Sequence, residues 1–235
     1  MNPYPARLAI FSRSLQACTL LTMFLAPAVA VCGPIHDAAR KGDQDRVVAL
    51  LKQNPELVFS RDKFGNTPLH LAALHNQPAV AALLLANGAD VNARNNPPAS
   101  WFNQERNQLG ETPLTLALQS YQHKEMLELL LTHGADPNVM LSDGGTPLHR
   151  AVSRDLPGDV ELLLANGADP DAKGSNWQSP LHFAVMGDKI KILEILLDYG
   201  ADPNVKDIGG HTPLYWAKFN DHEKAVALLI AHGAH

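Results

Sequence analysis

The chain is poor in cysteine, in aromatic side chains and in clustered positive charge, and each scarcity excludes a class of protein. Two cysteines in 235 residues, Cys18 and Cys32, are too few for a disulfide-built scaffold. Aromatic residues make up 6% of the chain against 46% apolar residues, so leucine and alanine carry the core. The net charge is −5 and the sequence has no basic run. Nucleic acid is therefore not an expected partner, because its binding needs a cationic footprint that displaces counterions.

The first thirty residues have the pattern of an export signal. Arg7 and Arg13 are the only charges in this segment, an apolar run spans 15–31, and Ala28-Val29-Ala30 supplies the small residues that signal peptidase accepts. The uninterrupted apolar part is shorter than the roughly 20 residues that a membrane-spanning helix needs. We therefore expect a signal peptide at 1–30, cleaved after Ala30. The protein is expected to be exported, with the periplasm as the favoured location and secretion as an alternative.

Two alternatives stay open for this segment. Val29-Ala30-Val31-Cys32-Gly33 resembles a bacterial lipobox, which would place a lipid anchor on Cys32. A lipobox has a small residue before its cysteine, and Val31 is bulky, so cleaved export is favoured over a lipoprotein. The second alternative is an uncleaved anchor, although Gln16 and Pro27 interrupt the run that it would use. After cleavage we expect no membrane span.

A repeat governs the chain after residue 34. A tetrapeptide of Thr or Ser, Pro, Leu and one further residue occurs five times, and its starts are separated by 45, 34, 33 and 33 residues. A second motif, which begins Gly-Ala, follows each copy in the same phase. The tetrapeptides begin at Thr67, Thr112, Thr146, Ser179 and Thr212, and the second motif at Gly88, Gly134, Gly167, Gly200 and Gly233. Such a period indicates a repeat architecture.

Each unit predicts a helix, a turn, a second helix and an extended loop. The Thr or Ser is expected to be an N-cap, and the Pro the first helical residue, since it has no amide to leave unpaired. An alanine five residues after each cap marks a close contact between helices, and an aliphatic pair in the second helix supplies the core. Glycine then ends that helix, and a short polar residue in the next turn is expected to bond its own backbone. The alanines are Ala72, Ala117, Ala151, Ala184 and Ala217, the pairs end at Leu84, Leu130, Leu163, Leu196 and Leu229, and the polar residues are Asn92, Asn138, Asp171 and Asn204.

These features together resemble the ankyrin repeat family over about residues 34–235. The resemblance implies an all-α solenoid of helix-turn-helix units joined by β-hairpin-like loops. After the signal peptide we expect an N-terminal capping repeat at 31–60 and five fuller repeats at 61–235, with a loop insertion around 94–108. Neighbouring units would bury one another's apolar faces and leave an extended concave surface rather than a pocket.

The resemblance implies a non-enzymatic, monomeric protein that binds another protein through its hairpin tips and the exposed side of each first helix. Trp101 and Phe102 are candidates because they are adjacent aromatic residues in the polar insertion, where packing onto neighbouring repeats is an equal alternative. Trp177 stands where the repeat otherwise keeps glycine before its cap. The remaining candidates, carried over position by position, are Phe64, Asn66, Leu74, His75, Gln119, Arg154, Met186 and Phe219.

Histidine is abundant, with eleven copies, but its placement favours a structural role. His70, His149 and His182 belong to the cap tetrapeptides, where we expect the imidazole to bridge the cap and adjacent backbone. The histidines from His222 onward lack the spacing of a zinc site, and the chain has no nucleophile elbow or phosphate loop. We therefore expect no metal and no cofactor. Two alternatives stand beside the binding module: an envelope immunity or stress-protection protein that masks or protects an enzyme, and a metal-dependent enzyme in a repeat frame.

Overall fold

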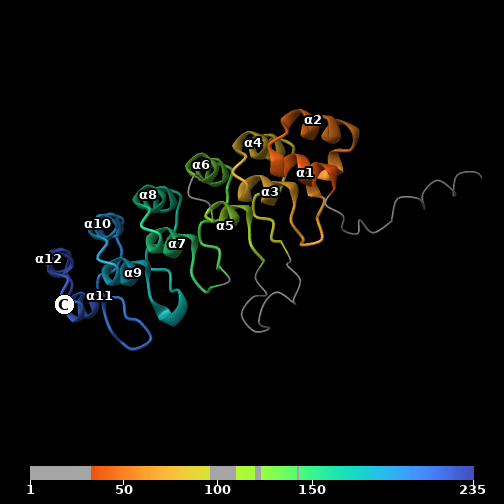
Figure 1. The fold of residues 1–235 in the computed structure, drawn as a ribbon. Coiled ribbons are helices and arrows are strands. Elements are labelled where there is room, and N and C mark those ends of the chain that lie inside the picture. Colours follow the sequence, from red (N-terminus) through yellow and green to blue (C-terminus); the bar gives the residue numbers. More distant parts are fainter. Residues whose placement is uncertain (1–32, 96–109, 120–122, 142) are drawn as a thin grey trace, which may run out of the picture.

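The computed structural model describes residues 33–95, 110–119, 123–141 and 143–235, which form an elongated stack of helix pairs (Figure 1). No strand occurs in these ranges, which confirms the predicted all-α class. None of their helices is long and apolar enough to cross a membrane. The expected signal segment 1–30 and most of the insertion, with Trp101 and Phe102, lie outside the described residues. The α-helices are α1 (Pro34–Lys41), α2 (Gln44–Gln53), α3 (Pro68–Leu74), α4 (Pro78–Ala86), α5 (Pro113–Ala117), α6 (Lys124–Thr132), α7 (Pro147–Ser153), α8 (Pro157–Ala165), α9 (Pro180–Met186), α10 (Ile190–Asp198), α11 (Pro213–Phe219) and α12 (Glu223–Ala231), and the 3-10 helices are η1 (Pro55–Phe59) and η3 (Ser175–Trp177).

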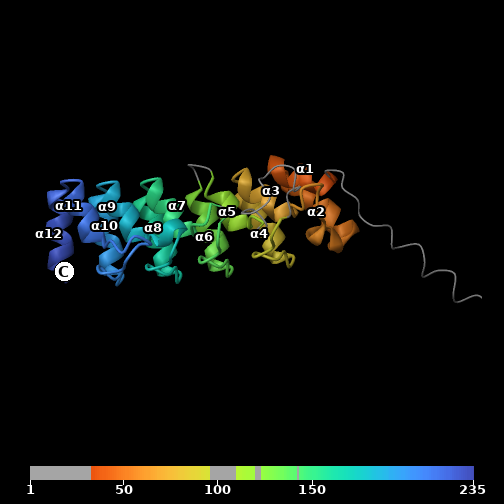
Figure 2. The same cartoon turned by 90° about the horizontal axis from the view of Figure 1, so that it is seen from below.

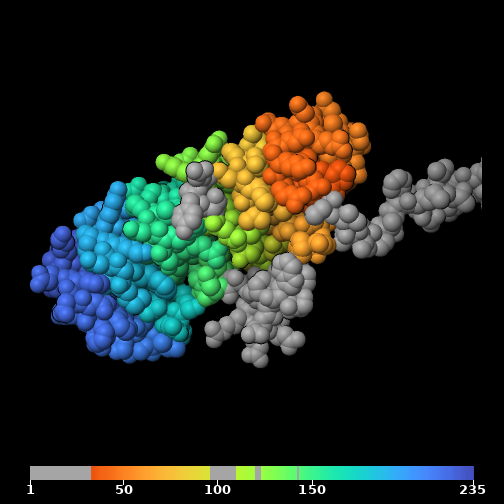
Figure 3. Space-filling view, viewed as in Figure 1, coloured from red at the N-terminus to blue at the C-terminus, as the bar shows by residue number. Residues whose placement is uncertain are grey.

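The helices form two parallel rows. The odd-numbered helices make one row and the even-numbered helices the other, and the long loops project from the odd-numbered row (Figures 1 and 2). Contacts run from α2 through α4, α6, α8 and α10 to α12, so each second helix packs on the next. The space-filling view shows the resulting body as a slanted, elongated stack (Figure 3). In the described residues each pair therefore packs mainly on its neighbours, as in a solenoid.

The cap tetrapeptides start the first helices as the sequence predicts. Thr67, Thr112, Thr146, Ser179 and Thr212 are N-caps with extended backbone, and the proline after each is the first helical residue. An extended cap residue turns the chain into the helix, and the missing proline amide leaves no donor without a partner. The glycines that close the second helices have φ between 84° and 89°, a left-handed conformation that glycine adopts without steric cost.

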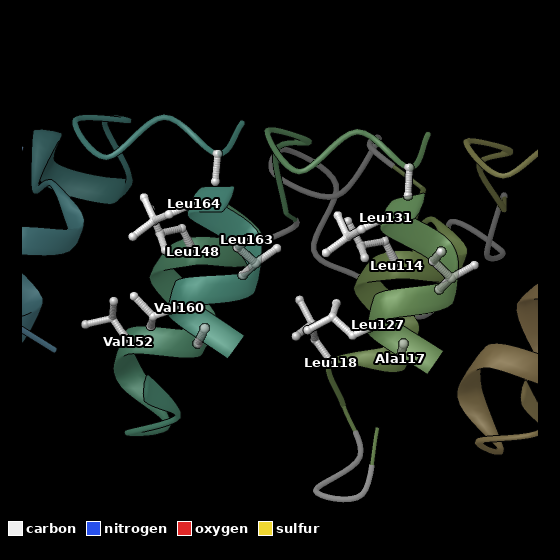
Figure 4. Close-up of a cluster of buried hydrophobic side chains, with 14 of the residues drawn as sticks. Leu114, Ala117, Leu118, Leu127, Leu131, Leu148, Val152, Val160, Leu163 and Leu164 are labelled. Carbon is white, nitrogen blue, oxygen red and sulfur yellow. The ribbon is translucent and has the colours of Figure 1, made fainter. Parts of the chain in front are cut away.

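The core is a column of aliphatic side chains that passes from pair to pair. The five alanines of the repeat are completely buried, and so is the second member of each aliphatic pair, whereas most first members are only half-buried. In Figure 4, Leu127 and Leu131 of α6 and Leu118, the C-cap of α5, extend toward the next pair, and Leu163 of α8 points back toward them. Full burial of one such side chain contributes about 1.5–3 kcal/mol, so the stack is held mainly across its repeat boundaries.

The cap histidines join neighbouring repeats as well as capping their own helix. In His70 the Nδ1 atom accepts from the Thr67 amide at 3.1 Å, so the proton lies on Nε2, which donates to the Glu111 carbonyl of the next repeat at 3.0 Å. His149 and His182 repeat this arrangement with the carbonyls of Gln178 and His211. The predicted bridge between cap and backbone is therefore confirmed, and it extends across the repeat boundary.

The turn asparagines do not bond their own backbone, so that expectation was wrong. Asn92 donates through Nδ2 to the Gly134 carbonyl at 3.0 Å and accepts through Oδ1 from the Asp136 amide at 2.8 Å, both in the following repeat. Asn138 and Asn204 form the same two bonds one and three repeats further on. The local turn is instead closed by Asp90, whose carboxylate accepts from the Asn92 amide. The asparagines thus form a ladder of bonds between repeats.

The base of the insertion is closed within the described residues. The amide of Asn95 donates to the Glu111 carbonyl at 2.9 Å, and the Glu111 amide donates to Asn95 Oδ1 at 2.7 Å. Arg94 also donates to the Gly110 carbonyl at 3.1 Å. These three bonds bring the two ends of the insertion together, so the repeat resumes at Thr112 in the phase of its neighbours.

One buried polar pair interrupts the apolar second-helix column. His123 Nε2 and Asp159 Oδ2 lie 2.6 Å apart, and both residues are buried. Asp159 stands where the other second helices of the described residues carry a buried apolar side chain, such as Met126 or Ile192. The pair links α6 to α8 across a repeat boundary. Its geometry provides each group with a hydrogen-bonding partner, which a buried polar side chain needs to avoid a penalty of 1–3 kcal/mol or more.

Asp171 is the weak point of the asparagine ladder, and replacing it is expected to stabilise the fold. It accepts from the Asp202 amide at 2.9 Å but has no donor for the carbonyl of Gly200. Burial raises its pKa, and the nearby Asp202 and Asp169 carboxylates add to that shift. A carboxyl with a raised pKa loses its stabilising contribution as the pH rises through that pKa. Asp171→Asn should therefore raise the free energy of unfolding at pH 7 by about 1 kcal/mol, and by less near pH 4.

Urea titration of the purified chain at both pH values measures this effect. The reverse change, Asn138→Asp, is the matched control and should lower the free energy of unfolding by a similar amount at pH 7. Equal stability of Asp171→Asn and the parent chain at pH 7 would contradict the ladder interpretation.

The cap histidines are expected to make the fold sensitive to acid. Burial lowers the pKa of His70 from 6.5 to about 4, and burial also lowers the pKa values of His149 and His182. The folded chain keeps these rings neutral while the unfolded chain protonates them near pH 6.5, so stability falls as the pH drops below 6.5. For His70 alone the loss at pH 5 is about 2 kcal/mol.

Urea titrations at pH 7, 6 and 5 test this. His70→Thr, which copies the Thr115 arrangement of the next repeat, should lower stability at pH 7 but make its pH dependence shallower. His232→Thr, at an exposed position, is the control for the general effect of replacing a histidine by threonine on stability at pH 7. A parent chain equally stable at pH 7 and pH 5 would refute the prediction.

Candidate interaction surface

The predicted partner-binding residues lie along the first-helix row and its loops, in two groups. Near the N-terminal end, Phe64 and Leu74 are half-buried and His75 is exposed. Near the C-terminal end, Trp177 is 56% exposed, Phe219 is 66% exposed and Met186 is half-buried. The structure therefore separates the candidates instead of bringing all of them to one place.

Three candidates are engaged within the fold. Asn66 donates to Asp62 Oδ2 at 3.1 Å and accepts from the side chain of Asn95 at 2.8 Å, so its polar atoms hold the hairpin. Arg154 donates to the carbonyls of Leu118 and Gln119 in the preceding repeat. The side chain of Gln119 is exposed, but its carbonyl belongs to this bond. These residues have a structural role whether or not a partner touches them.

Phe64 and His75 lie at opposite ends of α3, in the preceding hairpin and at the C-cap respectively. Burial lowers the pKa of His75, and the charge of Arg40 lowers it further. The ammonium of Lys63 lies 4.8 Å from the centroid of the Phe64 ring. Phe64 and Leu74 are only half-buried, so this end exposes less apolar area than the C-terminal end, where Trp177 and Phe219 are more than half exposed.

The C-terminal end has a larger apolar surface, part of which the sequence reasoning missed. Ile208, at the tip of the last hairpin, is 70% exposed, and Tyr215 of α11 is 44% exposed. The signal was present in the repeat pattern, because Tyr215 replaces the cap histidine and Trp216 follows it. The cap histidines that occupy the position of Tyr215 in other repeats are buried.

The aromatic residues of α11 and its hairpin form one cluster, which we call the aromatic platform and define as His211, Tyr215, Trp216 and Phe219. The rings of His211 and Tyr215 stack at a centroid distance of 4.2 Å, and those of Tyr215 and Phe219 lie nearly parallel at 6.1 Å. Trp216 meets Phe219 edge to face at 5.8 Å. Phe219 follows Tyr215 by four residues and Trp216 by three, so successive turns of α11 bring these rings into contact, and His211 stacks on Tyr215 from the hairpin. The platform is therefore preorganised before any partner arrives.

Asp207 fixes the platform to its hairpin. It is buried and accepts from the amides of Gly209 and His211 and from the Trp216 indole, each at 2.9 Å. Burial alone would raise the pKa of this carboxyl, but these donors together hold it below its usual value. A carboxylate with three donors stays ionised and directs the Trp216 ring. No such bond could be assigned from sequence, because it depends on the side-chain geometry of the hairpin.

Trp177 has a backbone conformation that its residue type disfavours. Its φ is +61°, whereas the equivalent residues of three other hairpins are glycines with φ of 75–82°: Gly65, Gly144 and Gly210. A left-handed conformation costs a residue with a Cβ roughly 1–2 kcal/mol. The exposed Trp177 ring forms a contact with the Lys173 ammonium, 4.6 Å from its centroid. Strain of this kind, at an exposed aromatic residue, points to a use other than folding.

The tips of the last two hairpins are adjacent. The amide of Ile208 donates to the carbonyl of Asn176 at 2.9 Å, which places Ile208 beside the residue that precedes Trp177. We call Trp177, Ile208 and the aromatic platform together the C-terminal surface. Its four most exposed side chains, which are 44–70% exposed, present roughly 400 Å² of apolar area. That is about half of what one side of a specific protein interface buries.

The comparisons with known proteins agree with this architecture. The family described as "Ankyrin repeats (3 copies)" matches residues 8–95, 99–174 and 158–235. The serine/threonine-protein kinase VIK of Arabidopsis thaliana is 40% identical over 96 residues, which are 41% of this chain and 19% of the kinase. Rabankyrin-5 of Homo sapiens is 38% identical over 87 residues, 37% of this chain and 7% of that protein. The chain thus spans less than a fifth of these curated relatives.

Solved structures match over nearly the whole described region. An ankyrin repeat domain from Acinetobacter baumannii has a TM-score of 0.74 at 30% identity, covering 86% of this chain and 98% of that one. A complex of a predatory endopeptidase from Bdellovibrio bacteriovorus with an immunity protein contains a chain with a TM-score of 0.67 at 23% identity. That match covers 84% of this chain and 97% of the other, and it shows the fold alone. The family match and the repeat geometry give one conclusion: the chain belongs to the ankyrin repeat family.

Proposed function

We propose that this protein is an exported binding module that holds a protein partner against its first-helix row and hairpin tips, chiefly at the C-terminal surface. Ankyrin repeats are generally protein-protein interaction modules, and this chain matches the family over its repeats. The observation that carries the proposal is the exposed Trp177 in a left-handed conformation, next to Ile208. Folding alone favours glycine at that position, so the tryptophan is best explained by contact with a partner.

A non-enzymatic role fits the same features. The ankyrin fold is typically an interaction scaffold, and the family matches on this chain are to repeats. The exposed aromatic residues supply contact area of the kind that protein interfaces use. Masking or protecting an envelope enzyme is a narrower form of this role, and it would use the same surface.

Replacing Trp177 should separate stability from binding. Trp177→Gly relieves the left-handed strain and Trp177→Ala does not, so the glycine variant should exceed the alanine variant in unfolding free energy by about 1 kcal/mol. Urea denaturation of the two variants measures this difference. Equal stabilities would show that the hairpin relaxes around any residue and would remove the argument from strain.

The same variants test binding. In a pull-down from envelope extracts, the parent chain should recover a protein that Trp177→Gly and Phe219→Ala recover at least tenfold less well. Tyr199→Ala is the matched control, because Tyr199 is 46% exposed but follows α10 in the other row. The proposal fails if no protein is captured, or if every captured protein is retained equally by the variants.

Export is the second part of the proposal and rests on the composition of residues 1–30. The family match begins at residue 8, inside that segment, so the processing site needs its own experiment. Intact-mass measurement of the protein expressed from its complete coding sequence should give a chain that begins at Val31. A lipid-modified chain beginning at Cys32 would establish the lipoprotein alternative, and an uncleaved chain in the cytoplasm would refute export.

A further inference from the structure

The exposed charges of the last two hairpins and of α9 and α11 have one sign. In residues 172–187 and 203–220 the charged side chains are Lys173, Lys206, Lys218 and Asp207. The three lysines are exposed, whereas Asp207 is buried. The whole chain carries a net charge of −5, so this basic rim is a local departure from the charge of the molecule.

The lysines border the apolar groups instead of forming ion pairs in the described structure. Lys173 lies over the Trp177 ring, and Lys206 has the equivalent place in the next hairpin, two residues before Ile208. Lys218 precedes Phe219 in α11. No ion pair in the described residues includes any of these lysines.

The nearby acids are placed elsewhere. Asp207 has its carboxylate occupied by three donors. Asp169, Asp171 and Asp202 belong to the turns after the second helices, where they accept backbone amides. Asp188 and Asp221 are exposed, but they follow the ends of α9 and α11, at the turns into the second helices and away from the hairpin tips. The surface itself therefore presents aromatic rings, aliphatic side chains and ammonium groups.

We propose that the C-terminal surface receives an acidic segment of a partner protein that also carries large apolar side chains. This rests on the proposed function and specifies the chemistry of the partner. An apolar side chain of that segment packs on the aromatic platform and beside Trp177 and Ile208, and carboxylates on either side of it meet Lys173, Lys206 and Lys218. Opposite charges at the rim of an apolar contact accelerate association and select the partner.

A single-stranded nucleic acid is a less suitable occupant. Its bases could stack on the platform, but its backbone needs a continuous positive track, and three lysines on a chain of net charge −5 do not provide one. A protein segment needs only a few carboxylates, and the same rings bury its apolar side chains. The charge pattern therefore favours the acidic protein segment.

Selection from a library of random dodecapeptides displayed on phage tests the proposal on the complete chain. The selected peptides should be rich in Asp and Glu and contain at least one aromatic or large aliphatic residue. Synthetic copies, measured by fluorescence anisotropy, should bind the Trp177→Gly/Phe219→Ala double variant at least tenfold more weakly than the parent. Tyr199→Ala should bind them with unchanged affinity. The affinity of the parent for the peptides should fall several-fold when the salt concentration rises from about 50 to about 300 mM.

Charge reversal gives the sharper test. Lys173→Glu/Lys206→Glu should bind the acidic peptides at least tenfold more weakly and should select basic peptides from the same library. Thermal unfolding of this variant should match the parent, because both lysines are exposed. Peptides without acidic enrichment, unchanged binding by the reversed variant, or failure to select any peptide would overturn the inference. So would an oligonucleotide that displaces the peptides and binds more tightly than they do.

The two proposals can fail separately. If the pull-down recovers a protein whose capture depends on Trp177 while the acidic peptides do not bind, the binding function stands and its acidic chemistry is wrong. If peptides bind this surface while the envelope extract supplies no partner, the acidic chemistry of the surface stands and the proposed function, an exported module that holds an envelope protein, is wrong.

Discussion

The burial of each helix pair against the next is the interaction on which the rest of this molecule depends. No pair can cover its own apolar face. The leucines and valines between α5–α6 and α7–α8 are therefore buried only because the two pairs pack together. Hydrogen bonds then set how the pairs meet. Each cap histidine bonds a backbone carbonyl just before the first helix of the following repeat, as His70 does with Glu111. Each turn asparagine bonds a backbone carbonyl just after the second helix of the following repeat, as Asn92 does with Gly134. Apolar contact supplies the free energy, and the two polar series fix the angle and spacing.

The difference between local capping bonds and bonds across repeat boundaries explains which features could be predicted from sequence. The period and the tetrapeptide place each first helix correctly, because an N-cap and a following proline act through local backbone geometry. The alanine column is likewise predictable, since only a small side chain permits close helix approach. Asn92 was assigned the right location and the wrong partner. Its own turn is closed by Asp90, and its amide is used across the boundary, which no single repeat reveals.

The candidate surface divides in the same way. Trp177 could be identified from sequence because it departs from a column of glycines, and Tyr215 could have been found because it departs from the cap histidines. The bond between Asp207 and Trp216 could not, because it joins two side chains whose orientation depends on the packed hairpin. The pairing of His123 with Asp159 has the same origin: one member replaces an apolar residue, and only the three-dimensional structure shows where its partner lies. Arg154 shows the opposite case, a residue assigned to binding that is also engaged in the fold.

The three hydrogen bonds at Asn95, Glu111, Arg94 and Gly110 have a consequence for how this chain can change. They join the residues on either side of the inserted segment. The register of the repeats is therefore set by these bonds and not by the length of the segment between them. Lengthening such an excursion costs little, since closure entropy grows only with the logarithm of its length. The molecule can therefore accept a different sequence or length between 96 and 109 while the α3–α5 contact stays as it is. That position is a natural place for related chains to diverge and for a foreign segment to be grafted.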